Sequence, residues 1–256
     1  MKRIVPTFTF LLILSILVSF ISCNKDGGSS TADSAAFSSG TGKGGSLARY
    51  TIAGNYLYAV DNHYLYAYSL ADPAKPVKVY TSPINFDIET IYPYDNKLFL
   101  GSKTGLYIYS IDTAAKPRLV GEAKHARSCD PVVANDSIAF VTLKSSGNCG
   151  PAVPGLYIHD IKNINLPILK TTVNLPDPVG LGLQDSILYV CCGNAGLKVF
   201  NVKSPYSPAL LSTKTDGNFV DVIPYDGILI CYVQDGILLY NITNPASPAL
   251  VRKIVN

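Results

Sequence analysis

The stretch Gly105–Val120, GLYIYSIDTAAKPRLV, belongs to a pattern that occurs five times along the chain, and in every copy a proline stands twelve residues after the first position. The copies begin 41, 50, 41 and 40 residues apart. Their first residues are Tyr64, Gly105, Gly155, Gly196 and Gly236, and their prolines are Pro76, Pro117, Pro167, Pro208 and Pro248. Fixed periods of this length are typical of repeat architectures, so the chain is expected to fold as a series of like units.

Each repeat contains four short apolar or alternating runs, and the last copy shows them at Phe219–Pro224, Ile228–Val233, Gly236–Ile242 and Ala249–Val255. Glycine-containing turns separate these runs, and Asn244–Pro248 forms a wider turn whose prolines a strand ladder would exclude. Four antiparallel strands in about 41 residues make one propeller blade. The sequence therefore predicts an all-β fold, a five-bladed β-propeller with blades at about 48–82, 88–123, 129–174, 177–214 and 219–256.

The ends of this propeller raise the question of closure, because no further strand remains to complete another blade. We expect the first and last blades to pack side to side, with help from the Gly-rich segment that precedes the repeats. The extra residues of the third copy, around Ser145–Pro154, are expected between its second and third strands.

The first 22 residues read as a secretory signal, with Lys2 and Arg3 followed by the apolar run Phe8–Ile21. The run ends in Phe20-Ile21-Ser22-Cys23, which resembles the lipobox of bacterial lipoproteins, in which the cysteine carries the lipid. An ordinary signal peptide followed by a stray cysteine is the alternative. Residues 23–47 are rich in Gly, Ser, Thr and Ala and are expected to be a lipid-anchored flexible linker.

The repeat unit, a strand followed by Gly-Leu and a downstream proline, resembles the LVIVD-repeat β-propellers, although no copy spells LVIVD. The words GLKVF, DIETIYPY and KHARSCDPVV are similar to a lipoprotein branch of that family found in Bacteroidota. The resemblance covers Gly42 to Asn256 and implies an exported outer-membrane lipoprotein, with possible exposure at the cell surface suggested by Lys25-Asp26. Relatives often carry Pro-His-Gly-Leu and Cys-Asp-Gly where this chain has Pro178-Val179-Gly180-Leu181 and Cys191-Cys192-Gly193, so the His and Asp of those motifs are replaced here.

The cysteines divide into three groups. Cys129 opens the first strand of the third copy and Cys149 lies in its insertion, so strand direction brings both to one face. A disulfide there is permitted in an exported protein and would contribute about 3 kcal/mol, while free thiols or metal ligands are the alternatives. Cys191 and Cys192 are adjacent, which leaves a vicinal bridge or soft-metal binding as alternatives, but at least one is expected to be a small buried apolar side chain, as is Cys231.

A binding site is predicted where the first strands of the blades begin, at one mouth of the central channel. Its candidate residues are His125, Arg127, Asp130, Glu89, Asp177 and Asp221. One histidine, one arginine and several carboxylates around a pit could hold a cation, a sugar or a polar peptide end. The alternative is structural, with the aspartates capping loop N–H groups. His159 takes the place of Ser110, Asn201 and Asn241 in its repeat, which predicts a surface or edge residue.

Charge and composition narrow the function. The formal charge of +3 falls to +1 once Lys2 and Arg3 are removed, which leaves no basic stripe for nucleic acid. We expect a monomer that binds a protein or glycan partner through one loop face, and that needs no cofactor beyond a possible structural cation. A hydrolase or lyase acting on extracellular polymer at the acidic channel mouth is the rival interpretation, and a purely structural envelope protein is a third.

Overall fold

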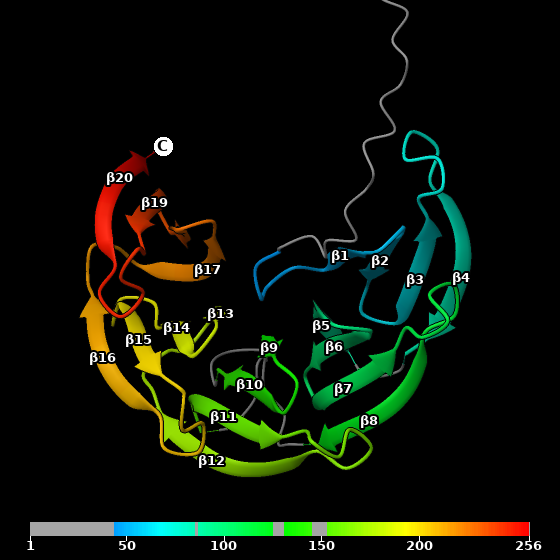
Figure 1. The fold of residues 1–256 in the computed structure, drawn as a ribbon, viewed down its shortest axis with the longest axis horizontal. Coiled ribbons are helices and arrows are strands. Elements are labelled where there is room, and N and C mark those ends of the chain that lie inside the picture. Colours follow the sequence, from blue (N-terminus) through cyan, green and yellow to red (C-terminus); the bar gives the residue numbers. More distant parts are fainter. Residues whose placement is uncertain (1–43, 85–86, 125–130, 145–152, 256) are drawn as a thin grey trace, which may run out of the picture. The chain divides into compact units, whose positions relative to one another are not determined.

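Five four-stranded antiparallel sheets follow one another along the chain and are arranged around a common centre (Figure 1). The computed structural model describes residues 44–84, 87–124, 131–144 and 153–255, all within one structural unit. Every sheet is built from four strands that are consecutive in sequence, with the first strand innermost and the fourth outermost. The predicted all-β, five-bladed propeller is therefore confirmed.

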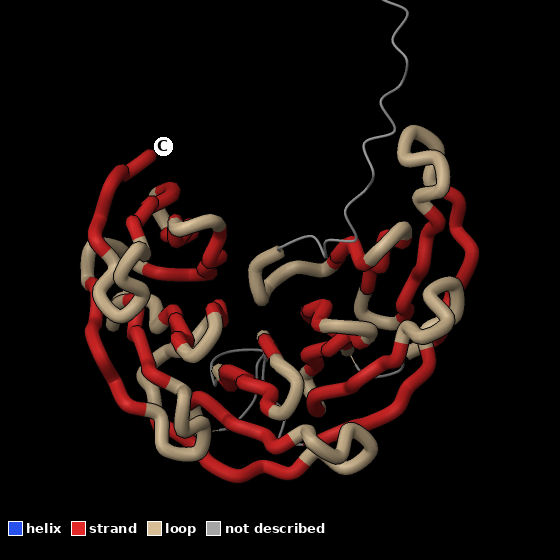
Figure 2. The backbone as a smooth tube through the Cα atoms, viewed as in Figure 1, coloured by secondary structure: helices blue, strands red, loops and turns tan. Residues whose placement is uncertain are grey.

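The strands are numbered in chain order, four to a blade (Figures 1 and 2). Blade 1 comprises β1 (Tyr50–Ala53), β2 (Tyr56–Val60), β3 (Tyr64–Ser69) and β4 (Val77–Pro83). Blade 2 comprises β5 (Ile88–Tyr94), β6 (Lys97–Ser102), β7 (Gly105–Ser110) and β8 (Arg118–Lys124). Blade 3 comprises β9 (Val132–Ala134), β10 (Ile138–Leu143), β11 (Gly155–Asp160) and β12 (Ile168–Asn174). Blade 4 comprises β13 (Leu181–Gln184), β14 (Ile187–Cys191), β15 (Leu197–Asn201) and β16 (Ala209–Lys214), and blade 5 comprises β17 (Phe219–Tyr225), β18 (Ile228–Val233), β19 (Gly236–Asn241) and β20 (Ala249–Val255).

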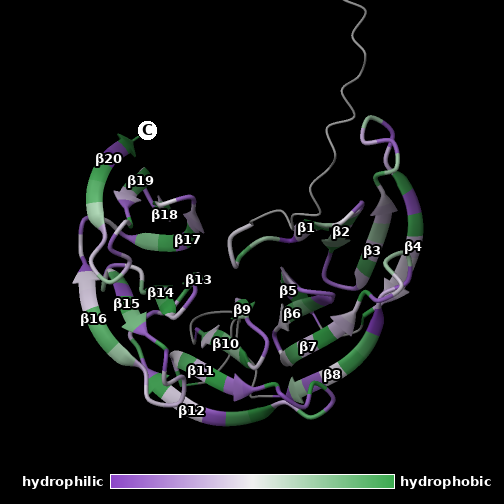
Figure 3. Ribbon diagram, in the orientation of Figure 1, coloured by the Kyte–Doolittle hydropathy of each residue, from purple (hydrophilic) through white to green (hydrophobic). Residues whose placement is uncertain are grey.

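The apolar core lies between neighbouring blades, because successive side chains of a strand point to opposite faces of its sheet. In β6, Leu98 and Leu100 pack in the cluster shared with blade 1, whereas Phe99 packs in the cluster shared with blade 3. The inner strands are therefore apolar on both faces, as a strand buried on both sides must be. The outermost strands carry polar residues but also exposed apolar ones such as Val77 and Leu210 (Figure 3). No helix among the described residues is long and apolar enough to cross a membrane.

The wide proline turn between the third and fourth strands also joins the blades. The Tyr58 hydroxyl of blade 1 donates to the Ala114 carbonyl in the turn of blade 2, at 2.8 Å. The Tyr189 hydroxyl of blade 4 does the same to the Pro245 carbonyl in the turn of blade 5, at 3.0 Å. Each bond satisfies a partly buried hydroxyl and fixes the position of one blade against the next.

The predicted side-to-side packing of the first and last blades is wrong for the described residues, whereas the help expected from the Gly-rich segment is observed. Strand contacts join each blade to its neighbour along the chain, and none of comparable extent joins blade 5 to blade 1 in the described part (Figure 1). Residues 44–49, here called the clasp, form the connection instead. The Ser46 hydroxyl donates to Asp221 of blade 5 at 3.0 Å and accepts from the Leu181 N–H of blade 4 at 2.8 Å, before the chain enters β1. Closure therefore depends on polar contacts of a short segment rather than on an apolar interface.

Two further expectations concern individual residues. His159 is not a surface residue, since only 4 % of it is exposed within β11. Counted from the start of its copy, His159 stands at the position of Tyr109, Phe200 and Tyr240, which are also buried. The comparison with Ser110, Asn201 and Asn241 is therefore one residue out of register. Cys191, Cys192 and Cys231 are buried free thiols, so the expected apolar role of these cysteines is confirmed. The predicted lipid site Cys23 and the predicted Cys129–Cys149 bridge lie outside the described residues.

Candidate functional site

The mouth at which the first strands begin is built as the strand directions predicted. The loop between the second and third strands of one blade meets the start of a first strand, as where Gly193 pairs with Phe219. In blade 2, Lys103 of this loop donates its N–H to the Asp87 carbonyl just before β5. Strand starts and these loops therefore share one face.

Glu89 and Asp177 lie at this mouth, each beside a lysine. Lys103 Nζ is 3.8 Å from Glu89 Oε1, and Lys144 Nζ is 2.8 Å from Asp177 Oδ1. Burial raises the pKa of Glu89, while Lys103 and Arg49 act in the opposite direction. The other predicted members, His125, Arg127 and Asp130, lie outside the described residues. Among the described residues this mouth is thus a set of paired charges rather than an open acidic pit.

Asp221, the third described carboxylate of the predicted site, is held by the clasp. It accepts the Ser46 hydroxyl at 3.0 Å and the Leu47 N–H at 3.3 Å. Burial raises the pKa of the Asp221 carboxyl, and these hydrogen bonds lower it in part. The clasp approaches closely because Gly45 has no side chain, since a Cβ there would lie 2.0 Å from Asp221 Oδ2. Asp221 therefore caps loop donors, which is the structural role that the sequence left open.

A pocket of about 290 Å³ lies toward the opposite end of the channel, where the first strands end. Its walls come from the first strands of blades 2 to 5 and from Gly44 of the clasp. Its aromatic and apolar lining residues include Tyr92, Tyr94, Leu183, Ile223 and Pro224. Burial raises the pKa of Tyr92 to about 12.

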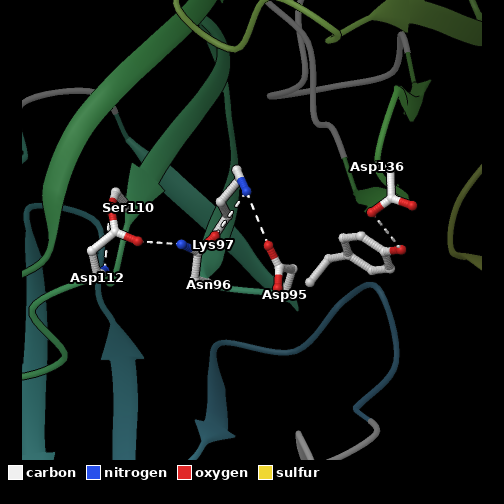
Figure 4. A network of polar contacts seen from close by, with 7 residues as sticks. Asp95, Asn96, Lys97, Ser110, Asp112 and Asp136 are labelled. Atoms are coloured by element: carbon white, nitrogen blue, oxygen red, sulfur yellow. Dashed lines mark hydrogen bonds and ion pairs between the residues drawn. The ribbon is translucent and has the colours of Figure 1, made fainter.

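Two residues that line this pocket, Tyr94 and Asp95, take part in polar contacts with side chains outside it (Figure 4). The Tyr94 hydroxyl donates to Asp136 Oδ1 at 3.0 Å, and Lys97 Nζ lies 3.2 Å from Asp95 Oδ2. Asn96 then donates to Asp112. Asp95 and its counterpart Asp226 begin tight turns with positive φ, so the repeated turn chemistry places carboxylates around this end of the channel.

An aromatic and apolar wall with a few polar groups at the rim is the usual composition of a ligand site. No group of three His, Cys, Asp or Glu side chains in the described ranges is placed to hold a metal ion. The described histidines do not line the pocket: His63 lies in the turn between β2 and β3, and His159 lies in β11.

Sequence reasoning missed the residues of this pocket. Tyr94 and Pro224 were visible only as the ends of apolar runs, and Asp95 and Asp226 only as turn residues. Their common signal is the repeat position itself, because the last residues of every first strand must meet at one end of the channel.

Comparison with known proteins gives the fold. No family model and no curated protein matches the chain. A computationally designed protein, Ika8, matches with a TM-score of 0.56 and 14 % identity over 79 % of this chain and 59 % of that one. A Lactobacillus plantarum protein matches with a TM-score of 0.60 and 10 % identity, over 78 % of this chain and 68 % of its own. A Pseudomonas aeruginosa periplasmic gluconolactonase, PpgL, matches with a TM-score of 0.58 and 12 % identity, over 79 % and 68 %. The chain thus spans about three-fifths to two-thirds of these proteins.

Proposed function

We propose that the chain is an LVIVD-like cell-envelope lipoprotein whose propeller binds a protein or glycan partner through one loop face. The pocket lined by Tyr92, Tyr94 and Pro224 carries this proposal, because it combines aromatic surface with hydrogen-bonding groups at its rim. The binding face is then the one at which the first strands end. This differs from the mouth that the sequence suggested, where the described carboxylates are paired with lysines or with the clasp.

The rival function, a hydrolase or lyase, requires an acid and a base placed on one substrate. Glu89 and Asp177 are each held by a lysine, and Asp221 by the clasp, so none of the three is favoured for that role. The likeness to a gluconolactonase is a likeness of fold, which hosts many unrelated functions. Binding is therefore the function that the described site supports best.

Replacing Tyr94 with alanine is expected to reduce capture of the partner at least tenfold in a pull-down from intact cells. The change removes an aromatic wall of the pocket and its hydrogen bond to Asp136. Tyr206→Ala is the matched control, because Tyr206 makes a similar bond to Asp160, at 2.7 Å, away from the pocket. Equal capture by both variants and wild type would contradict a site in this pocket.

The membrane anchor is proposed from the lipobox-like segment that ends at Cys23. Cys23→Ser should release the protein from the membrane fraction or leave its signal segment uncleaved, because lipid addition needs the thiol. Fractionation and mass spectrometry of the N-terminus measure both effects. A variant that is processed and fractionates like wild type would rule out the anchor.

A further inference from the structure

The face of blade 5 that points away from blade 4 is built like a buried interface. Matching strand registers make Ile230 and Tyr232 of β18 the counterparts of Tyr189 and Cys191 in β14. The counterparts in blade 4 are fully buried against blade 5. Tyr232, however, is 54 % exposed. The same relation holds in the third strand, where Leu197 and Val199 of blade 4 are fully buried while Ile237 and Leu239 of blade 5 are exposed or half-buried.

The face of blade 1 that points away from blade 2 corresponds to the other side of such an interface, the side that blade 2 buries against blade 1. Tyr50 is the counterpart of Ile91, which is 1 % exposed in the interface of blades 1 and 2, yet Tyr50 is 67 % exposed. Tyr66 and Tyr68 correspond in the same way to the buried pair Tyr107 and Tyr109. Lys78 Nζ lies 5.6 Å from the centre of the Tyr66 ring, so a cation also borders this face.

Such terminal faces are unusual for a repeat array. Terminal repeats usually carry a polar outer face, because an interface-type surface left in water favours association. Here both terminal blades keep the residue types that the internal blades bury. The clasp connects the two blades through Ser46 and Asp221 but covers neither face fully, as the exposure of Tyr50 and Tyr232 shows.

We propose that these two faces bind each other between copies of the chain, with blade 5 of one copy packed on blade 1 of the next. Each internal junction joins a face of the blade-5 type to a face of the blade-1 type, and the chain itself presents one exposed example of each. A second copy is therefore a protein that offers the surface each face is built to bury. Within one copy the two faces do not pack together, so association between copies leaves the four internal junctions unchanged. The contact is head-to-tail, which replaces the monomer expected from the sequence.

Two variants test this arrangement. In sedimentation experiments the wild-type chain should form oligomers that grow with concentration. Tyr232→Lys and Tyr50→Lys each place a charge on one face, and each alone should associate at least tenfold more weakly. An equal mixture should form heterodimers and no larger species, because Tyr50→Lys retains the blade 5 face and Tyr232→Lys retains the blade 1 face.

Leu210→Lys is the matched control, since Leu210 is 53 % exposed on outer strand β16 and lies on neither terminal face. It should associate like wild type, and circular dichroism should show all four proteins folded. A wild-type chain that stays monomeric at every concentration would overturn the proposal, as would a single variant that still associates while the mixture gains nothing. A disulfide formed within one molecule of a Tyr50→Cys and Tyr232→Cys double variant would show instead that the faces close on each other, which also overturns it.

Discussion

Gly236→Ala is expected to lower the free energy of unfolding by about 2–4 kcal/mol, from backbone strain together with overpacking. Gly236 begins β19 with a φ of 144°, a backbone conformation that residues other than glycine rarely adopt. A Cβ at this position would lie 2.0 Å from the Ile254 carbonyl oxygen of β20. The ladder between these two strands would have to open, and chemical denaturation measures the loss.

Gly227→Ala separates the two causes. Gly227 also has positive φ, 74°, but a Cβ there would meet nothing within 4 Å. We therefore expect a cost of only about 1 kcal/mol from strain alone. If both variants lose the same stability, the close approach of the β20 carbonyl is not what selects glycine at the start of the third strand.

Ser46→Ala is expected to lower the free energy of unfolding by about 1–3 kcal/mol, although Ser46 precedes the first strand. The hydroxyl bonds both the Leu181 N–H and the Asp221 carboxyl, and its loss leaves a buried N–H and a half-buried carboxyl without this partner. Ser204→Ala, at an exposed turn position, is the control and should change stability little. Limited proteolysis before Tyr50 should accelerate only in Ser46→Ala. If stability and cleavage are unchanged, the clasp does not hold the two ends of the propeller.

The pH dependence of the free energy of unfolding provides a second test of the contacts between Asp221 and the clasp. Because burial raises the pKa of Asp221 above its ordinary value, the folded chain holds this proton at pH values where the unfolded chain has lost it. The contribution of Asp221 to stability therefore falls as the pH rises from about 4 through its folded pKa. Asp221→Asn should remove that part of the pH dependence. A wild-type profile that the variant reproduces would contradict a buried, ionising carboxyl at this position.

Much of the fold could be predicted from the sequence because every repeat contains the same strand and turn signals. The apolar runs define the strands, and the fixed proline marks the turn before each fourth strand, where Tyr58 and Tyr189 bond the next blade. The candidate site could be predicted less well. Strand direction placed Glu89 and Asp177 on one face, but the lysines beside them come from other positions of the repeat.

The clasp shows where sequence reasoning stopped. Residues 44–47 look like the end of a Gly- and Ser-rich linker, and nothing in their composition distinguishes Ser46 from its neighbours. Its role depends on Asp221, 175 positions away in the chain, and that contact exists only because the propeller brings blade 5 beside the start of blade 1. His159 was misjudged for a different reason. It occupies the repeat position of Tyr109, Phe200 and Tyr240, which their blades bury, rather than the position of Ser110, Asn201 and Asn241.

The sequence by itself thus determined the blade, the number of blades and their order, because these follow from local periodicity and turn chemistry that every copy repeats. Only the tertiary structure decided how the clasp joins the ends of the ring, which carboxylates lie beside lysines or the clasp, and where the aromatic pocket lies. Those features depend on distances between residues in different copies. Such distances depend on the angle between packed blades. That angle results from many side-chain contacts between blades, and no single repeat contains them.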